Sequence, residues 1–279
     1  MIPAAIPAAD LRAAQRAVAH LFPTAEEMDS GVSNERTDPW RTTFDAKWPE
    51  FPYRSRSLSG LPGHDAVLEV ASSFLRTDDL RLYMSTITAK YANQSSEYNQ
   101  LLHADFPNHS LLVPQVDDRY PQLELFVYLT DVTTAGGATR VVSRRKTAHI
   151  PIERHTLSYA DYPDLYNDPA DASGPAGSIV AYRPDVYHRS VDVTEPGVCR
   201  IMMHVSYRVA DAEWSQYQGW AFKGFSPEWH TFVQASNPRE LALFGFPKPG
   251  HPYWTDETIK RVNARYPGLD MTPWRAGLS

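Results

Sequence analysis

The chain has 279 residues, of which 42% are hydrophobic and 22% charged, and its formal net charge is −6. This length suffices to bury a substantial core, and the composition is that of a globular protein. A mildly acidic chain argues against a main role in binding nucleic acid or an anionic membrane.

Helical patterns lie towards the two ends of the chain. Residues 8–22 are alanine-rich and repeat apolar side chains at helical spacing, with Asp10 as the expected N-cap. Residues 63–80 have the pattern of a second helix, and residues 256–268 begin with acids and end at Pro-Gly. We therefore expect helices that flank the centre of the fold.

The middle of the chain has the composition of β-strands, broken by turn residues such as TTAGGA, SGPAG and TEPG. The expected strands are residues 80–92, 110–116, 123–132, 139–143, 177–183, 187–193 and 198–209. Short strands with regular breaks predict a double-sheet jelly roll or barrel rather than βαβ units. We expect a mainly β fold with flanking helices, as one domain over 1–279 with its β core at about 80–210.

Residues 210–254 are crowded with aromatic side chains. They include Trp214, Tyr217, Trp220, Phe222, Phe225 and Trp229. Such a cluster more often packs against the outer face of a sheet; the alternative is a cover over a substrate site.

The chain contains one cysteine, Cys199, so an intramolecular disulfide is excluded and a reducing compartment is favoured. Cys199 lies in an apolar, strand-like run, where a buried thiol is usually unreactive. The sequence shows neither the pattern of a signal peptide nor an apolar run of membrane-spanning length. We expect a cytoplasmic protein.

The run LLHADFPNHS, residues 101–110, contains a histidine and an aspartate two positions apart. On a strand, residues i and i+2 point to the same face, so His103 and Asp105 can reach one point. A lone H-x-D is more often a hydrogen-bonded surface pair, and a metal site needs a second histidine from a later strand. His188, in GSIVAYRPDVYHRS, is the candidate.

The segment after residue 177 reads as strand, turn, strand, hairpin turn and strand, with TEPG closing the hairpin. Folding there brings Arg200 nearly opposite Ser190, which shares a face with His188. Two histidines and one carboxylate with open coordination positions form the facial triad of non-haem Fe(II) oxygenases. An inward arginine is a buried charge that needs an anion, and a dicarboxylic cosubstrate supplies one.

These features together resemble the phytanoyl-CoA dioxygenase-like family of Fe(II)/2-oxoglutarate oxygenases, over roughly residues 70–210. The matching features are HAD at 103–105, LTDVTTAGGATRVVSRRK at 129–146, GSIVAYRPDVYHRS at 177–190 and Arg200. The chain departs from the family at SRRK, residues 143–146, where many members have a proline-glycine-serine-histidine run. The family's substrates therefore do not carry over by analogy.

The resemblance implies a double-stranded β-helix core, which is a jelly-roll, cupin-like fold, and an Fe(II)- and 2-oxoglutarate-dependent dioxygenase. His103, Asp105 and His188 would bind Fe(II). Arg200 would pair with the far carboxylate of 2-oxoglutarate, and Ser190 would add a hydrogen bond. With O2, the enzyme would hydroxylate a small organic substrate and release succinate and CO2. Hydroxylation is expected rather than halogenation, because related halogenases carry a small residue at the position of Asp105.

Two other interpretations stay open. One is a metal-binding cupin-like protein or an inactive relative that binds a carboxylate ligand, for which Arg200 is not a requirement. The other is a structural or interaction role carried by the aromatic C-terminal third, which predicts no metal dependence. Among the remaining polar residues, we expect His204 to be an inward-facing core histidine. Gln100 and Tyr98 are further candidates for the pocket.

Overall fold

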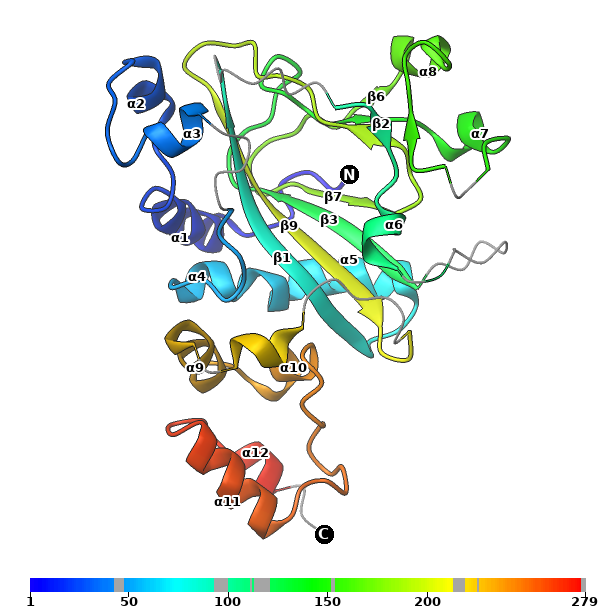
Figure 1. The fold of residues 1–279 in the computed structure, drawn as a ribbon. Coiled ribbons are helices and arrows are strands. Elements are labelled where there is room, and N and C mark those ends of the chain that lie inside the picture. The colour runs from blue at the N-terminus through cyan, green and yellow to red at the C-terminus, as the bar shows by residue number, and fades with distance from the viewer. Residues whose placement is uncertain are drawn as a thin grey trace.

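The computed structural model describes residues 1–42, 48–92, 100–110, 112, 121–151, 154–212, 219–224 and 226–276. Two antiparallel sheets form its centre (Figure 1). The main sheet has the order β1 (Leu80–Tyr91), β9 (Cys199–Val209), β3 (Gln122–Tyr128), β7 (Ile179–Tyr182). The second sheet has the order β5 (Thr156–Leu157), β2 (Leu102–His103), β8 (His188–Arg189), β4 (Arg140–Val141), β6 (Ala170–Asp171).

The two faces of the main sheet differ in chemistry because side chains alternate along a strand. On β9, Ile201, Met203, Val205 and Tyr207 join the large hydrophobic core that lies under the helices. The alternate residues of β9 and its neighbours face the second sheet, and apolar ones such as Met202 pack between the two sheets. We call this second surface the inner face.

Helices flank the sheets on the outer side of the core (Figure 1). The N-terminal ones are α1 (Ala8–Val18), α2 (Ala25–Asp29), α3 (Asp38–Thr42), α4 (Arg56–Ser59), a 3₁₀ turn (Leu61–Gly63) and α5 (Asp65–Leu75). Short helices α6 (Phe106–His109), α7 (Arg144–Thr147) and α8 (Pro163–Asn167) interrupt the β region. A 3₁₀ turn (Trp220–Lys223), α9 (Pro227–Gln234), α10 (Pro238–Ala242), α11 (Asp256–Arg265) and α12 (Thr272–Arg275) follow it.

The helices expected near both ends of the chain are present, and each is shorter than its pattern. The first begins directly after Pro7, so Asp10 lies in its first turn and the expected N-cap is wrong. Proline at that position has no N–H and a fixed φ, which suits the start of a helix. Within the described residues, no helix has both the length and the apolar character that crossing a lipid bilayer requires.

The described part of the aromatic segment packs on the outer side of the main sheet. Phe51 lies among the rings of Trp220, Trp229, Phe232 and Phe244, at centroid distances of 5.4, 6.2, 4.7 and 5.1 Å. These rings join the same core as the outward residues of β9. The packing interpretation is therefore confirmed for Trp220 and Trp229; Trp214, Tyr217, Phe225 and the side chain of Phe222 lie outside the described residues.

One expectation about the strands is wrong, and two short strands were not foreseen. The hairpin closed by TEPG does not form, because β8 pairs with β2 and β4 in the second sheet, whereas β9 pairs with β1 and β3 in the main sheet. The two-residue strands β5 and β6 were not expected, since so short a pairing leaves no periodic pattern. The strand expected at 110–116 lies almost wholly outside the described residues.

Candidate metal centre

Strand pairing places the two predicted ligand histidines side by side. His103 on β2 is directly opposite His188 on β8, and their ring centroids are 4.5 Å apart. Directly opposite residues of adjacent strands present their side chains on the same face. Both imidazoles therefore point to one place, although 84 residues lie between them in the sequence.

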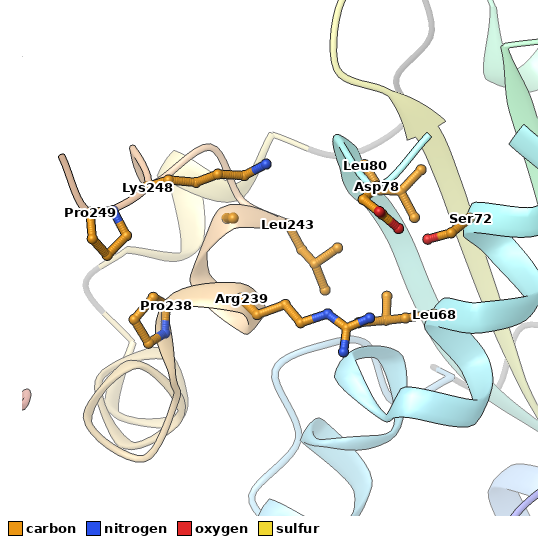
Figure 2. A pocket seen from close by; sticks show the side chains of 10 residues that line it. Leu68, Ser72, Asp78, Leu80, Pro238, Arg239, Leu243, Lys248 and Pro249 are labelled. Carbon is orange, nitrogen blue, oxygen red and sulfur yellow. The ribbon is translucent and has the colours of Figure 1, made fainter. Parts of the chain in front are cut away.

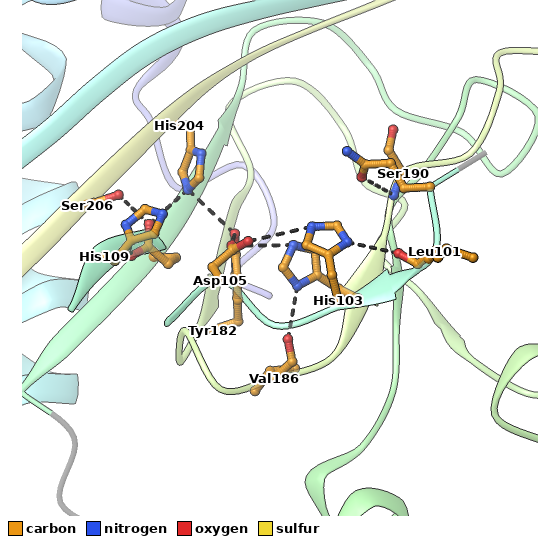
Figure 3. Close-up of polar contacts among 12 residues, drawn as sticks. Leu101, His103, Asp105, His109, Tyr182, Val186, Ser190, His204 and Ser206 are labelled. Carbon is orange, nitrogen blue, oxygen red and sulfur yellow. Dashed lines mark hydrogen bonds and ion pairs between the residues drawn. The ribbon is translucent and has the colours of Figure 1, made fainter. Parts of the chain in front are cut away.

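Asp105 reaches the same place from beyond the end of β2. Its backbone has helical angles, φ −81° and ψ −22°, and its N–H donates to the carbonyl of Pro184 at 2.8 Å. The expectation that Asp105 shares a strand with His103 is thus wrong in detail. The turn nevertheless brings its carboxylate 3.6 Å from Nε2 of His103 and 3.4 Å from Nε2 of His188 (Figure 3).

The hydrogen bonds of the two histidines prepare both rings for a metal. Nδ1 of His103 lies 2.9 Å from the carbonyl of Leu101, and Nδ1 of His188 lies 3.0 Å from the carbonyl of Val186. A carbonyl can only accept, so each Nδ1 carries the proton and each Nε2 keeps its lone pair. The candidate ligand atoms of His103, Asp105 and His188 all lie within 4.8 Å of one another. This donor set fits a divalent transition metal.

The electrostatics of the site favour the same ligand forms. Burial lowers the pKa of His103, and the neighbouring His188 imidazole lowers it further. Burial alone would raise the pKa of Asp105, but the imidazoles of His188 and His103 outweigh it and hold this pKa at about 2. At neutral pH the site therefore presents a neutral imidazole on His103 and an ionised carboxylate, the forms that bind metal.

Two buried cations converge on Ser190, close to the histidines. Arg200 donates to Ser190 Oγ at 3.2 Å and also to the carbonyl of Gly137. Lys90 is directly opposite Arg200 in the β1–β9 pairing, and its Nζ lies 3.3 Å from the same Oγ. The contact expected between Arg200 and Ser190 is therefore present, although it runs between the two sheets and not across a hairpin.

Lys90 is a residue of this cluster that the sequence did not reveal. Its Nζ donates to the carbonyl of Val191 and lies 3.4 Å from the carboxylate of Asp192. Burial, followed by the charge of Arg200, lowers the pKa of Lys90 to about 7, against the opposing effect of Asp192. A lysine within an apolar strand can indicate a functional site. Only the pairing of β1 with β9, however, shows that Lys90 lies opposite Arg200.

Gln100 also borders the cluster, because its Oε1 accepts a hydrogen bond from the N–H of Ser190 at 3.1 Å. Tyr98, the other pocket candidate, lies outside the described residues.

Cys199 occupies the first position of β9, and burial raises the pKa of its thiol. The thiol is therefore protonated at neutral pH, as expected for an unreactive cysteine.

A buried polar network adjoins the metal centre on the inner face (Figure 3). At its centre is Glu124, a fully buried carboxylate that accepts hydrogen bonds from the hydroxyls of Ser206 and Tyr83. Nε2 of His204 lies 2.9 Å from it, and Nδ1 of His109 lies 3.4 Å from it. Burial would raise the pKa of Glu124, but these histidines outweigh it and lower the pKa. His204 is thus a satisfied core histidine, as expected.

Further charged side chains lie on α7 and around a surface pocket. The basic run of α7 is held by acids, since Arg144 lies 3.0 Å from Asp185 and Lys146 lies 2.6 Å from Asp168. A surface pocket lies between α5, the start of β1 and α10 (Figure 2). Residues such as Leu68, Leu243, Arg239 and Lys248 line this pocket. None of the triad or the cation cluster is among its lining residues.

Known structures resemble this one closely enough to show the fold. HygX from Streptomyces hygroscopicus, with nickel and 2-oxoglutarate bound, has a TM-score of 0.52 at 15% identity, over 75% of this chain and 81% of HygX. The epimerase SnoN, in complex with Fe3+, alpha ketoglutarate and nogalamycin RO, has a TM-score of 0.53 at 13% identity, over 81% of this chain and 84% of SnoN. AviO1 from Streptomyces viridochromogenes has a TM-score of 0.50 at 12% identity, over 77% of this chain and 90% of AviO1.

The chain has the double-stranded β-helix fold of these proteins, which confirms the predicted fold class. No family model matches the chain, and no curated protein sequence matches it. The finer resemblance to the phytanoyl-CoA dioxygenase-like family therefore stays a prediction.

Proposed function

We propose that the chain is an Fe(II)- and 2-oxoglutarate-dependent dioxygenase that hydroxylates a small organic substrate and releases succinate and CO2. The observation that carries the proposal is the convergence of His103, Asp105 and His188, with both Nε2 lone pairs turned towards the carboxylate. HygX and SnoN, which have the same fold, are described with a metal and 2-oxoglutarate bound.

The three ligands would hold the iron at one side of the space between the sheets. Bound iron supplies the activation of O2, coupled to decarboxylation of the 2-oxo acid. The chain contributes position: the Nδ1–H bonds to backbone carbonyls fix the rings of His103 and His188, and burial of Asp105 limits access of water to its carboxylate.

Arg200, Lys90 and Ser190 would bind the far carboxylate of 2-oxoglutarate. A guanidinium and an ammonium that meet in a buried place repel each other; Asp192 already lies beside Lys90, and a further carboxylate would reduce the repulsion more. Ser190 lies two residues from His188, so the cluster is adjacent to the metal ligands. A dicarboxylic 2-oxo acid would place its far carboxylate on the cations and its other end at the metal.

The first experiment is an anaerobic titration of the apo-protein with Fe(II) and then 2-oxoglutarate, followed by visible absorption. We expect the weak charge-transfer band of a metal-chelated 2-oxo acid, and its loss in Asp105→Ala. His155→Ala is a matched control, because the His155 ring lies 6.5 Å from that of His103 and outside the triad. Iron binding without the band would favour a metal-binding cupin-like protein instead, and absence of iron binding would refute the proposal.

Epimerisation is a second candidate outcome, because SnoN is an epimerase. Product mass separates the two reactions. Hydroxylation adds one oxygen atom to the substrate, whereas epimerisation leaves its mass unchanged, and both outcomes require the same metal and cosubstrate site in this chain.

The remaining expectations belong to the same proposal. The substrate is a small molecule and not a nucleic acid or a membrane lipid, as the net charge of −6 favours. The single cysteine fits a reducing compartment, and we propose the cytoplasm. Fractionation of the native host, with a small-molecule screen read by succinate release, tests both expectations.

A further inference from the structure

Both carboxylate oxygens of Asp105 lie next to polar side chains of the site. Oδ1 lies 3.6 Å from Nε2 of His103, and Oδ2 lies 3.4 Å from Nε2 of His188. Oδ2 also accepts a hydrogen bond from the Tyr182 hydroxyl at 2.9 Å. Tyr182 comes from β7 of the main sheet, whereas the histidine ligands come from the second sheet, so this hydrogen bond ties the metal centre to the opposite layer (Figure 3).

The network behind Tyr182 sets the direction of that hydrogen bond. Glu124 is a carboxylate, which only accepts, so His204 must present a protonated Nε2 to it across the 2.9 Å contact. The same Nε2 lies 3.5 Å from the Tyr182 oxygen. A nitrogen that carries its proton cannot accept another, so the Tyr182 proton cannot point to His204. It points to Asp105.

We propose that Tyr182 is a positioning residue that orients the Asp105 carboxylate for a metal through its hydrogen bond to Oδ2. Glu124, acting through His204, fixes the orientation of the Tyr182 hydroxyl. This inference rests on the proposed function, because it requires a metal at the triad.

Co(II) titrations of the apo-protein test the proposal without turnover. We expect Tyr182→Phe to bind Co(II) roughly 10–100-fold more weakly than the parent chain, the usual cost of losing a partner that orients a metal ligand. The visible d–d bands of bound Co(II) should also change, because the freed carboxylate alters the coordination. Tyr207→Phe is the matched control: its buried hydroxyl donates to the carbonyl of Pro62, and Tyr207 lies on the outward face of β9.

A second pair of variants keeps the test independent of how well Tyr182→Phe folds. His204→Gln retains N–H groups for Glu124 and the Tyr182 oxygen, and should bind Co(II) as the parent does. His204→Leu loses them and should bind more weakly, with altered bands. Parental affinity and an unchanged spectrum in both Tyr182→Phe and His204→Leu would overturn the positioning role. If the parent itself fails to bind Co(II), or His103→Ala binds it equally well, both the proposed metal site and the positioning role of Tyr182 are wrong.

Discussion

Replacing Arg200 with methionine separates cosubstrate binding from metal binding. Arg200→Met keeps the length and packing of the side chain and removes its charge and its hydrogen bonds. Truncating one partner of a buried, hydrogen-bonded charge pair costs about 2–5 kcal/mol. Lys90 remains opposite and still attracts a carboxylate, so the loss should fall in the lower half of that range. About 3 kcal/mol corresponds to roughly 10²-fold weaker binding of 2-oxoglutarate.

The assay is isothermal titration of 2-oxoglutarate into Ni(II)-loaded protein, preceded by a Ni(II) titration of the apo-form. Ni(II) affinity should be unchanged, because Arg200 contacts Ser190 and Gly137 and is not a ligand. Thermal unfolding checks that the variant is folded. If Arg200→Met bound 2-oxoglutarate within about threefold of the parent, the assignment of this residue to the far carboxylate would be wrong.

Three further outcomes follow from the structure. Asp105→Ala should weaken Fe(II) binding by at least roughly 10²-fold, since it removes the charged ligand, whereas His155→Ala should not; equal affinities in dye-competition titrations would exclude the triad. Because the pKa of Lys90 is about 7, its charge is present below that pH and lost above it. Affinity for 2-oxoglutarate should therefore decline between about pH 6 and 8, and Lys90→Met should flatten that profile; parallel profiles would contradict the role of Lys90. Phe51→Ala should lower the free energy of unfolding by about 3–5 kcal/mol in urea denaturation while leaving Co(II) affinity unchanged, and a loss under about 1 kcal/mol would rule out its central packing role.

The parts of the site that sequence could predict are those whose residue type is dictated by chemistry. Imidazoles and a carboxylate are the ligands of a facial triad, and a guanidinium is the preferred partner of a carboxylate. His103, Asp105 and His188 meet as predicted, and Arg200 contacts Ser190 as predicted. Long strands such as β1 and β9 were also predictable, because twelve and eleven residues of strand composition leave a clear pattern.

The parts that sequence could not predict depend on long-range pairing. The segments that become β8 and β9 are close in the chain, which favours a hairpin, yet each finds its partners in a different sheet. Lys90 meets Arg200 only because of the β1–β9 register. Tyr182 meets Asp105 only because the two sheets face each other. Local composition does not specify which distant segments pair in any of these three cases.

The two sheets contribute different chemical groups to the site. The second sheet carries the two histidines of the candidate metal centre, whereas the main sheet presents cations at one end of its inner face, at Lys90 and Arg200, and an acid at the other, at Glu124. Glu124 is opposite a residue six positions along β9 from Arg200, which is roughly 20 Å of strand. The Glu124 carboxylate contacts His204 and His109, and as an anion it does not attract a carboxylate ligand. Under the proposed function, the main sheet would therefore orient an anionic cosubstrate by this difference in charge. Substitutions at the cationic end should change cosubstrate affinity alone, and substitutions around Glu124 should change metal affinity alone.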